Sequence, residues 1–368
     1  MPENTIHIPV DTLKNFMHDV LVAVGVPPED ALICTDVIIT SDLRGIESHG
    51  IGRLKYYYDR IKTGQHKVIT KTEIIKESAT TAVIDGHQGM GMVVATRAMQ
   101  MAIDKAKKYG LGAVAVRNST HFGIAGYYPL MAVKQGLIGI TVTNARPSMA
   151  PTFGVRPMLG TNPIAFGAPT DEEFPFLYDA ATPITQRGKI EVLAREEKSV
   201  PAGWIIDSQN QPMNDPNAIL AAVGKEKAAF LPLGGVGEIL GGHKGYGLGT
   251  MVEILCASMQ SGAFLWGLSG LDAKGRPQPF KVGHFFMVIN IDNFVPLEEF
   301  KKTTGQILRE LRASTKTPGQ TRIYTAGEKE YEKEILVRAQ GIPAVPNLQK
   351  EINFLKKELN LTQYNFPF

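Results

Sequence analysis

Cysteine is scarce in this chain, and no cluster of histidines or carboxylates takes its place. The 368 residues include only Cys34 and Cys256, which lie far apart and in no Cys-x-x-Cys pattern. This argues against a disulfide framework and a structural zinc site, and we expect two reduced thiols in the core. The eight histidines are dispersed, and no His-x-x-x-His pair occurs. We therefore expect no bound metal.

A large net charge and long apolar runs are missing too. The 39 basic and 36 acidic residues leave a net charge of +3, and no run of Lys and Arg lies among aromatic residues. A nucleic-acid partner is therefore not expected. The N-terminus lacks the basic and then apolar order of a signal peptide, and charges such as Glu253 interrupt the apolar runs. These absences predict a soluble cytoplasmic protein without membrane contact.

Three motifs of common nucleotide-binding and hydrolytic enzymes are absent. The turn at 85–94 contains Gly89-Met-Gly91, but it lacks the third glycine of the dinucleotide-binding fingerprint. That glycine is needed because the helix must pack closely on the strand. The P-loop pattern is missing, and no serine lies in Gly-x-Ser-x-Gly. Rossmann, P-loop and serine-hydrolase chemistry are therefore not indicated.

The remaining composition is that of an ordinary globular enzyme, with 43% hydrophobic and 20% charged residues. The length suggests two or three lobes in a mixed α/β fold. After Gly136, Gly, Pro, Asn and Thr between short apolar runs favour many short strands over helices. Apolar spacing predicts helices over 10–24, 31–43, 52–63, 92–109, 246–261, 297–312, 329–340 and 348–359, and strands over 72–76, 81–84, 113–116, 137–143 and 283–291.

The segment 42–54 gathers polar side chains between glycines and suits an anionic substrate. Arg44 and Arg53 can bind a carboxylate through paired hydrogen bonds. Ser48 can donate or accept a hydrogen bond, and His49 can change its protonation near neutral pH. The alternative is a loop whose polar residues serve capping and solubility alone.

Three further segments combine reactive side chains with a flexible backbone. His121 follows a predicted strand, where side chains often line an active site, although it could instead support a turn. Arg146 follows the next strand as a second carboxylate ligand or a solvated surface arginine. The glycine-rich stretch 234–249, which contains Lys244, opens a helix and suits a phosphate group. Together these features favour a small carboxylate substrate and a phosphate-bearing cofactor.

Four stretches, taken together, resemble the malate/L-lactate dehydrogenase family of the type 2 kind. They are 42–54, 117–128, 159–165 and 242–248, and the resemblance keeps its order from about residue 6 to about residue 345. That family also includes L-sulfolactate, ureidoglycolate and piperideine-2-carboxylate enzymes. Residues 231–235 and the strand from His284 look most similar to the archaeal-type malate dehydrogenases.

The resemblance implies NAD- or NADP-dependent interconversion of a 2-hydroxy acid and a 2-oxo acid, most simply malate and oxaloacetate. It also implies a non-Rossmann fold, with a largely antiparallel or mixed sheet flanked by helices, in a homodimer. An N-terminal helical segment, 1–70, is expected to join the C-terminal helices, 297–368. The region 71–296 is then expected to bind cofactor and substrate, possibly in two lobes.

The family's site residues carry over to matching positions. His121 matches the proton acceptor, Ser48 and His49 match the substrate-side motif, and Arg53 would bind the 1-carboxylate. Cofactor-contacting positions are matched by Ala145, Asp179, Ala180, Ala181, His243 and Lys244. Relatives often have Met where this chain has Ala180, which is a mild change.

Arg146 lies beside a cofactor position, and we expect it to pair with a distal carboxylate. A sulfolactate dehydrogenase, another 2-hydroxy acid dehydrogenase and a cyclic imine reductase remain alternatives within the enzyme class. A catalytically silent cofactor-binding scaffold is the alternative outside it. The choice between NAD and NADP and the role of His49 stay open.

Overall fold

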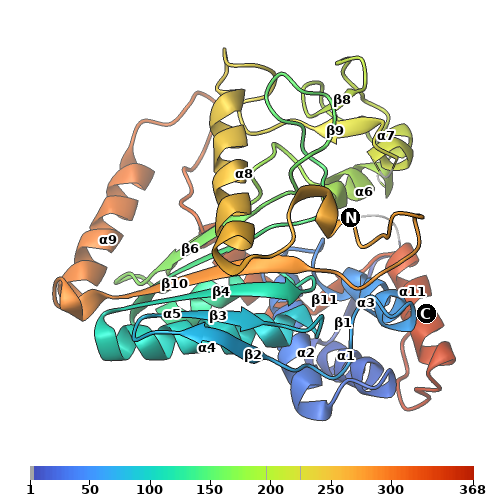
Figure 1. Cartoon of the computed structure of the whole chain (residues 1–368), viewed down its shortest axis with the longest axis horizontal. Coiled ribbons are helices and arrows are strands. Elements are labelled where there is room, and N and C mark those ends of the chain that lie inside the picture. Colours follow the sequence, from blue (N-terminus) through green and yellow to red (C-terminus); the bar gives the residue numbers. More distant parts are fainter. Residues whose placement is uncertain (1–3, 196, 224) are drawn as a thin grey trace.

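One seven-stranded sheet forms the centre of the computed structural model, which describes residues 4–195, 197–223 and 225–368 (Figure 1). Only β3 and β4 pair in parallel, and every other neighbouring pair in this sheet is antiparallel. The expected mixed sheet is therefore confirmed. In spatial order the strands are β2 (Glu73–Glu77), β3 (Thr81–Asp85), β4 (Leu111–Ser119), β10 (Val282–Asn290), β5 (Leu137–Thr143), β6 (Ile164–Ala168) and β7 (Phe176–Ala180).

Helices cover both faces of this sheet. On one face lie α4 (Gly91–Tyr109) and α5 (Tyr127–Val133), whose apolar side chains share a core with β4 and β10. Gly112 allows α4 to approach β4, because a Cβ there would lie 2.0 Å from the Ala102 carbonyl oxygen. On the other face, α8 (Gly242–Ala257) packs Val252 and Cys256 against Val142 and Phe285. The sheet is thus buried on both sides where the chain crosses its middle.

The two ends of the chain meet in a second core. β1 (Ile6–Ile8) pairs antiparallel with β11 (Ile342–Ala344). Apolar residues of the N-terminal helices pack with residues 337–361 in one cluster. The other elements of this unit are α1 (Val10–Ala23), α2 (Pro28–Leu43), η1 (Ile51–Arg53), α3 (Leu54–Lys62), α10 (Glu328–Gln340) and α11 (Pro346–Glu358). In contrast, α9 (Leu297–Ala313) lies apart from α1 and α2, on the side of β6 (Figure 1).

The part of the chain between β7 and α8 forms a third, smaller core. It contains α6 (Arg187–Arg195), β8 (Ile205–Asp207), α7 (Pro216–Val223) and β9 (Ala228–Phe230). The expectation of short strands rather than helices after Gly136 is wrong for α6 and α7. Each presents only about two turns of apolar spacing. The overlooked signal for α7 was Pro216 in the first turn after Asp215, whose carboxylate accepts from the Asn217 amide at 2.8 Å.

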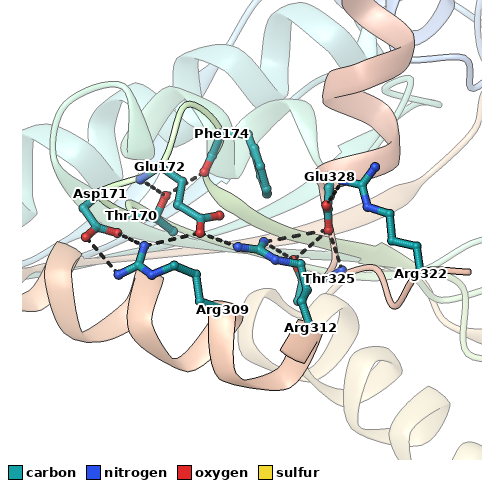
Figure 2. Close-up of polar contacts among 9 residues, drawn as sticks. All are labelled: Thr170, Asp171, Glu172, Phe174, Arg309, Arg312, Arg322, Thr325 and Glu328. Carbon is teal, nitrogen blue, oxygen red and sulfur yellow. Dashed lines mark hydrogen bonds and ion pairs between the residues drawn. The ribbon is translucent and has the colours of Figure 1, made fainter. Parts of the chain in front are cut away.

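An ion-pair network fastens the C-terminal part to the turn between β6 and β7 (Figure 2). Arg309 binds Asp171 through two nitrogens, at 2.9 and 3.2 Å. Arg312 pairs with Glu172 and lies 3.8 Å from Glu328. We call this group the clasp: Asp171, Glu172, Arg309, Arg312, Arg322 and Glu328.

The clasp positions the edge of the main sheet. Directly before α10, the Ala326 carbonyl accepts from the Leu177 amide of β7 at 3.2 Å. A Cβ on Gly327 would lie 2.9 Å from the Pro175 carbonyl oxygen. The segment that precedes α10 therefore lies directly against β7, the strand that carries Asp179.

Both cysteines are buried and free, as expected from the sequence. Among the described residues, no helix combines the length and the apolar character that a membrane crossing requires.

Candidate active site

Strands β4 and β5 run in the same direction on either side of β10 and end on the same side of the main sheet. The predicted acid-base and carboxylate-binding residues lie directly after these two strand ends. His284, near the start of β10, pairs with Val116 of β4 on one side and Thr143 of β5 on the other. The segments that follow β4 and β5 consequently leave the sheet together. His121 lies on the first segment and Arg146 on the second.

His121 is held by a side chain of α3. The Tyr57 hydroxyl lies 2.7 Å from Nδ1 of His121, and Tyr57 is completely buried. Exclusion of water lowers the pKa of His121 well below its ordinary value, and the neighbouring His49 and Arg53 lower it further. The imidazole is therefore neutral near pH 7. When its hydrogen sits on Nδ1 and is donated to Tyr57, Nε2 keeps a free lone pair.

The segment 42–54 folds into a tight loop beside His121. The buried Asp42 carboxylate accepts from the Ile51 amide at 2.7 Å, and Gly50 is required because a Cβ would lie 1.8 Å from that carboxylate. Nε of Arg53 donates to the Ser48 carbonyl oxygen at 2.7 Å. The loop therefore turns Ser48 and Arg53 toward each other.

Within this loop, Ser48 and His49 form a pair. Oγ of Ser48 lies 2.8 Å from Nδ1 of His49. The His49 ring stacks on the His121 ring, with centroids 5.5 Å apart and planes inclined by 21°. Desolvation, assisted by Arg53, lowers the pKa of His49 to about 3. The structure thus brings Ser48, His49, Arg53 and His121 together.

The sequence motifs did not single out Tyr56 and Tyr57, which the structure places beside His121. Tyr57 lies four residues after Arg53, the residue directly before α3, so the two side chains share one side of this helical segment. Tyr56 lies under two guanidinium groups, with Arg53 at 5.9 Å and Arg60 at 5.0 Å from its ring centre. The signal available in the sequence was this spacing relative to Arg53.

Arg146 belongs to a group of positive side chains beside this site. The loop that carries it is anchored by Asn144, whose Oδ1 accepts from the Gly283 amide at 2.8 Å. Arg146 itself is exposed. Partial desolvation of the guanidinium and the like charges of Arg187 and Arg60 lower the pKa of Arg146. The Arg146 guanidinium is thus placed where a further anion would be attracted.

Arg44 faces a different part of the molecule. It caps the end of α2, is buried, and lies 3.7 Å from the Glu334 carboxylate of α10. This partner comes from the C-terminal part of the chain, so the sequence around Arg44 gave no sign of it. We therefore assign Arg44 to the contact between α2 and α10 and omit it from the substrate site proposed below.

Backbone hydrogen bonds and close contacts join the predicted cofactor segments into one layer, which we call the backbone layer. The Thr182 amide, directly after residues 179–181, donates to the Thr161 carbonyl at 3.0 Å. The Thr182 carbonyl accepts from the Leu233 amide at 3.0 Å, just before the glycine-rich loop. Ala145 contacts the same layer, since a Cβ on Gly160 would lie 2.4 Å from its carbonyl oxygen.

The glycine-rich loop folds back on the start of α8. A Cβ on Gly234 would lie 2.3 Å from the Gly241 carbonyl carbon, and one on Gly242 would lie 2.1 Å from the Gly235 carbonyl oxygen. His243 and Lys244 are exposed in the first turn of this 16-residue helix. Backbone N–H groups and a lysine in this position fit a phosphate-bearing cofactor.

Asp179 links β7 to the loop that follows His121. One of its carboxylate oxygens accepts from the Gly126 amide at 2.7 Å, and a Cβ on Gly126 would lie 2.9 Å from the same oxygen. Ala180 ends β7, and Ala181 directly follows it. Residues 179–181 therefore connect the backbone layer around Thr182 to the loop that follows His121.

Comparison with known proteins assigns the family. The model of the malate/L-lactate dehydrogenase family matches residues 8–353. The malate dehydrogenase of Pyrococcus horikoshii is 44% identical over 98% of this chain and 97% of its own length. The L-sulfolactate dehydrogenase of Methanocaldococcus jannaschii is 39% identical over 98% and 97%.

A solved structure agrees with these relatives. The malate dehydrogenase from Entamoeba histolytica superposes with a TM-score of 0.95 at 46% identity, and the match covers 99% of this chain and all of that one. The chain therefore belongs to the malate/L-lactate dehydrogenase family of NAD(P)-dependent oxidoreductases.

Proposed function

We propose that this protein interconverts malate and oxaloacetate with NAD or NADP as the hydride carrier. The observation that carries this proposal is the neutral His121, held by Tyr57 near the proposed carboxylate ligand Arg53. Arg60, whose charge acts on Arg146, contacts the Tyr56 ring that also lies against His121. A neutral base with cationic side chains nearby suits a 2-hydroxy acid that carries a second anion.

His121 is the proposed general base. In the tautomer whose Nδ1 hydrogen faces the Tyr57 hydroxyl, Nε2 accepts the hydroxyl proton of the substrate, and the 2.7 Å contact with Tyr57 fixes the ring. Burial raises the pKa of Tyr57 above its usual range, so the phenol stays neutral throughout. A positioned base of this kind typically contributes about 100- to 10,000-fold to the rate.

Arg53 and Ser48 are the proposed ligands of the 1-carboxylate. Arg53 already donates through Nε to the Ser48 carbonyl, which fixes the direction of its guanidinium. His49 orients the Ser48 hydroxyl through their 2.8 Å contact. Arg146 binds the distal carboxylate, and such a charge-assisted hydrogen bond is worth about 1.5 to 3 kcal/mol.

Ala145, residues 179–181, His243 and Lys244 are the proposed cofactor contacts. The start of α8 and Lys244 would bind the phosphates, and Ala145 and residues 179–181 line the connected backbone layer. The bound cofactor supplies the hydride acceptor for C2 of the hydroxy acid. These contacts suit NAD and NADP alike.

The protein is further proposed to act as a homodimer. Supporting this, α8 exposes apolar side chains along one side, with Leu248 at 39%, Met251 at 43% and Ile254 at 53%. Such a row suits burial against a second copy. Light scattering on the purified protein should give twice the mass of the chain. In the Met251→Lys variant the measured mass should fall toward that of the monomer. A monomeric wild type would contradict the dimer.

The test of the reaction is loss of NADH or NADPH absorbance with oxaloacetate, pyruvate, sulfopyruvate and a cyclic imine. Fastest turnover of oxaloacetate is expected. Sulfolactate dehydrogenase activity is the second candidate, because Arg146 would bind a sulfonate as well as a carboxylate. No oxidation with any of the four substrates would favour the catalytically silent scaffold.

A further inference from the structure

The first turn of α6 reaches into the substrate side of the site. A Cβ on Gly188 would lie 2.9 Å from Cβ of Ser48 and 3.5 Å from Nη2 of Arg53. The backbone of α6 therefore touches the two residues proposed to anchor the 1-carboxylate. No side chain fits between the helix and Ser48 without moving one of them.

Arg187 is the residue next to this contact. Nε of Arg187 bonds to the Glu191 carboxylate one turn further on, at 2.9 Å, and 52% of the Arg187 side chain is exposed. Glu191 thereby restricts the direction of a guanidinium that water and small ions can still reach.

The positive charge of Arg187 acts on Arg146 and helps to lower its pKa. Of the neighbouring charges, that of Arg187 has the largest effect on Arg146, followed by that of Arg60. Two guanidiniums brought together by different segments, one after β5 and one on α6, are stabilised when an anion lies between them. The first turn of α6 thus contacts Ser48 and Arg53 and also carries a positive charge that acts on Arg146.

We propose that Arg187 is a specificity-determining residue that binds the distal acidic group of the substrate together with Arg146. This inference rests on the proposed function and deepens it. The substrate class becomes 2-hydroxy acids whose far end carries a carboxylate or sulfonate, and two guanidiniums bind that end. Gly188 allows α6 to approach closely enough for Arg187 to take part.

The experiment compares Arg187→Gln with the wild type, using kcat/KM for oxaloacetate, sulfopyruvate and pyruvate. The variant should lose about 10- to 100-fold on whichever two-anion substrate the wild type prefers, because one charge-assisted contact is removed. Turnover of pyruvate, which has no second anion, should change by less than about threefold. Arg187→Lys should lose less than Arg187→Gln, because it keeps the charge.

Arg338→Gln is the matched control. Arg338 also pairs with a glutamate one helical turn away, at 2.6 Å, and its side chain is 57% exposed, but it lies on α10. The control should leave all three constants unchanged. Circular dichroism checks that both variants are folded.

The outcomes separate this inference from the reaction itself. If the wild type reduces oxaloacetate or sulfopyruvate but Arg187→Gln loses nothing, or loses equally on pyruvate, the Arg187 inference is wrong and the proposed function stands. If the wild type prefers pyruvate to both two-anion substrates, the proposed malate activity and the Arg187 inference both fail.

Discussion

The clasp and the proposed substrate site are both rich in arginine, but their arginines have different partners. By the proposed substrate site, called the pocket below, we mean His121 with Arg53, Arg60, Arg146 and Arg187. In the clasp, Arg309, Arg312 and Arg322 each pair with a carboxylate, so three positive charges face three negative ones (Figure 2). In the proposed substrate site, Arg53 bonds to a backbone carbonyl and Arg60 to the Gln65 amide oxygen, whereas the half-exposed Arg187 pairs with Glu191 of its own helix.

This difference decides what each cluster can do. In the clasp, where each of these arginines is paired with a carboxylate, the charges are neutralised locally and the pairs hold segments together. A guanidinium that is fixed by a neutral acceptor keeps its charge and still has a defined direction. The pocket is therefore suited to attract an anion, whereas the clasp is suited to fasten α9 and α10 to β7.

The largest expected effect lies in the pocket. His121→Ala should lower kcat for malate oxidation by about 100- to 10,000-fold, because the proton acceptor is removed. Stopped-flow or steady-state assays measure the rate, and NADH fluorescence should show that cofactor binding is retained. Turnover at the wild-type rate would move the base to His49.

Arg146→Ala tests whether the unneutralised charge selects the substrate. The ratio of kcat/KM for malate to that for lactate should fall about 10- to 100-fold, since only malate has a distal carboxylate to lose the contact. Steady-state kinetics with both substrates give this ratio. An unchanged ratio would remove Arg146 from the specificity site.

The clasp should respond in stability rather than in chemistry. Glu328 is almost completely buried, and it accepts from the Thr325 amide at 3.0 Å besides pairing with Arg322 and Arg312. Glu328→Gln should lower the free energy of unfolding by about 1 to 3 kcal/mol, because a partly buried arginine loses its counter-charge.

Urea denaturation measures this loss, and Lys301→Gln, which breaks the exposed pair of Lys301 with Glu298 on the same helix α9, is the control. The wild-type ratio of kcat/KM for malate to that for lactate should be retained in Glu328→Gln. A change in that ratio without a change in stability would show that the clasp takes part in substrate selection.

The last expected effect concerns pH. Burial lowers the pKa of both His66 and His284 to about 3, below the unfolded value near 6.5. The unfolded chain then binds more protons between these two values, so stability should fall as the pH drops from about 6.5 toward 3. The slope is at most about 1.4 kcal/mol per pH unit for each group.

His66→Phe should flatten that slope. Neither ring nitrogen of His66 has a hydrogen-bond partner within the described residues, and its ring lies against Tyr57 and Phe280. Phenylalanine would keep the aromatic contacts while removing the titrating group. The free energy of unfolding, taken from denaturation curves at several pH values, should change less steeply with pH in this variant. An identical dependence on pH would contradict the assignment.

The sequence predicted the helices of the two larger cores because their apolar residues repeat over several turns, as in α1 and α4. It also predicted the meeting of Ser48, Arg53 and His121, through family motifs. It missed α6, whose amphipathic pattern is short, and Arg187 was missed with it. It could not show that Arg44 pairs with Glu334, because that contact depends on how the chain's ends pack together.

The most direct test of the account is the specificity of the unaltered protein for oxaloacetate, sulfopyruvate and pyruvate, measured as kcat/KM with NADH and with NADPH. The account predicts that a substrate with two anionic groups is preferred to pyruvate by at least about tenfold, the equivalent of one charge-assisted contact. Equal or better use of pyruvate would contradict the claim that the pocket's unneutralised arginines select a second anion.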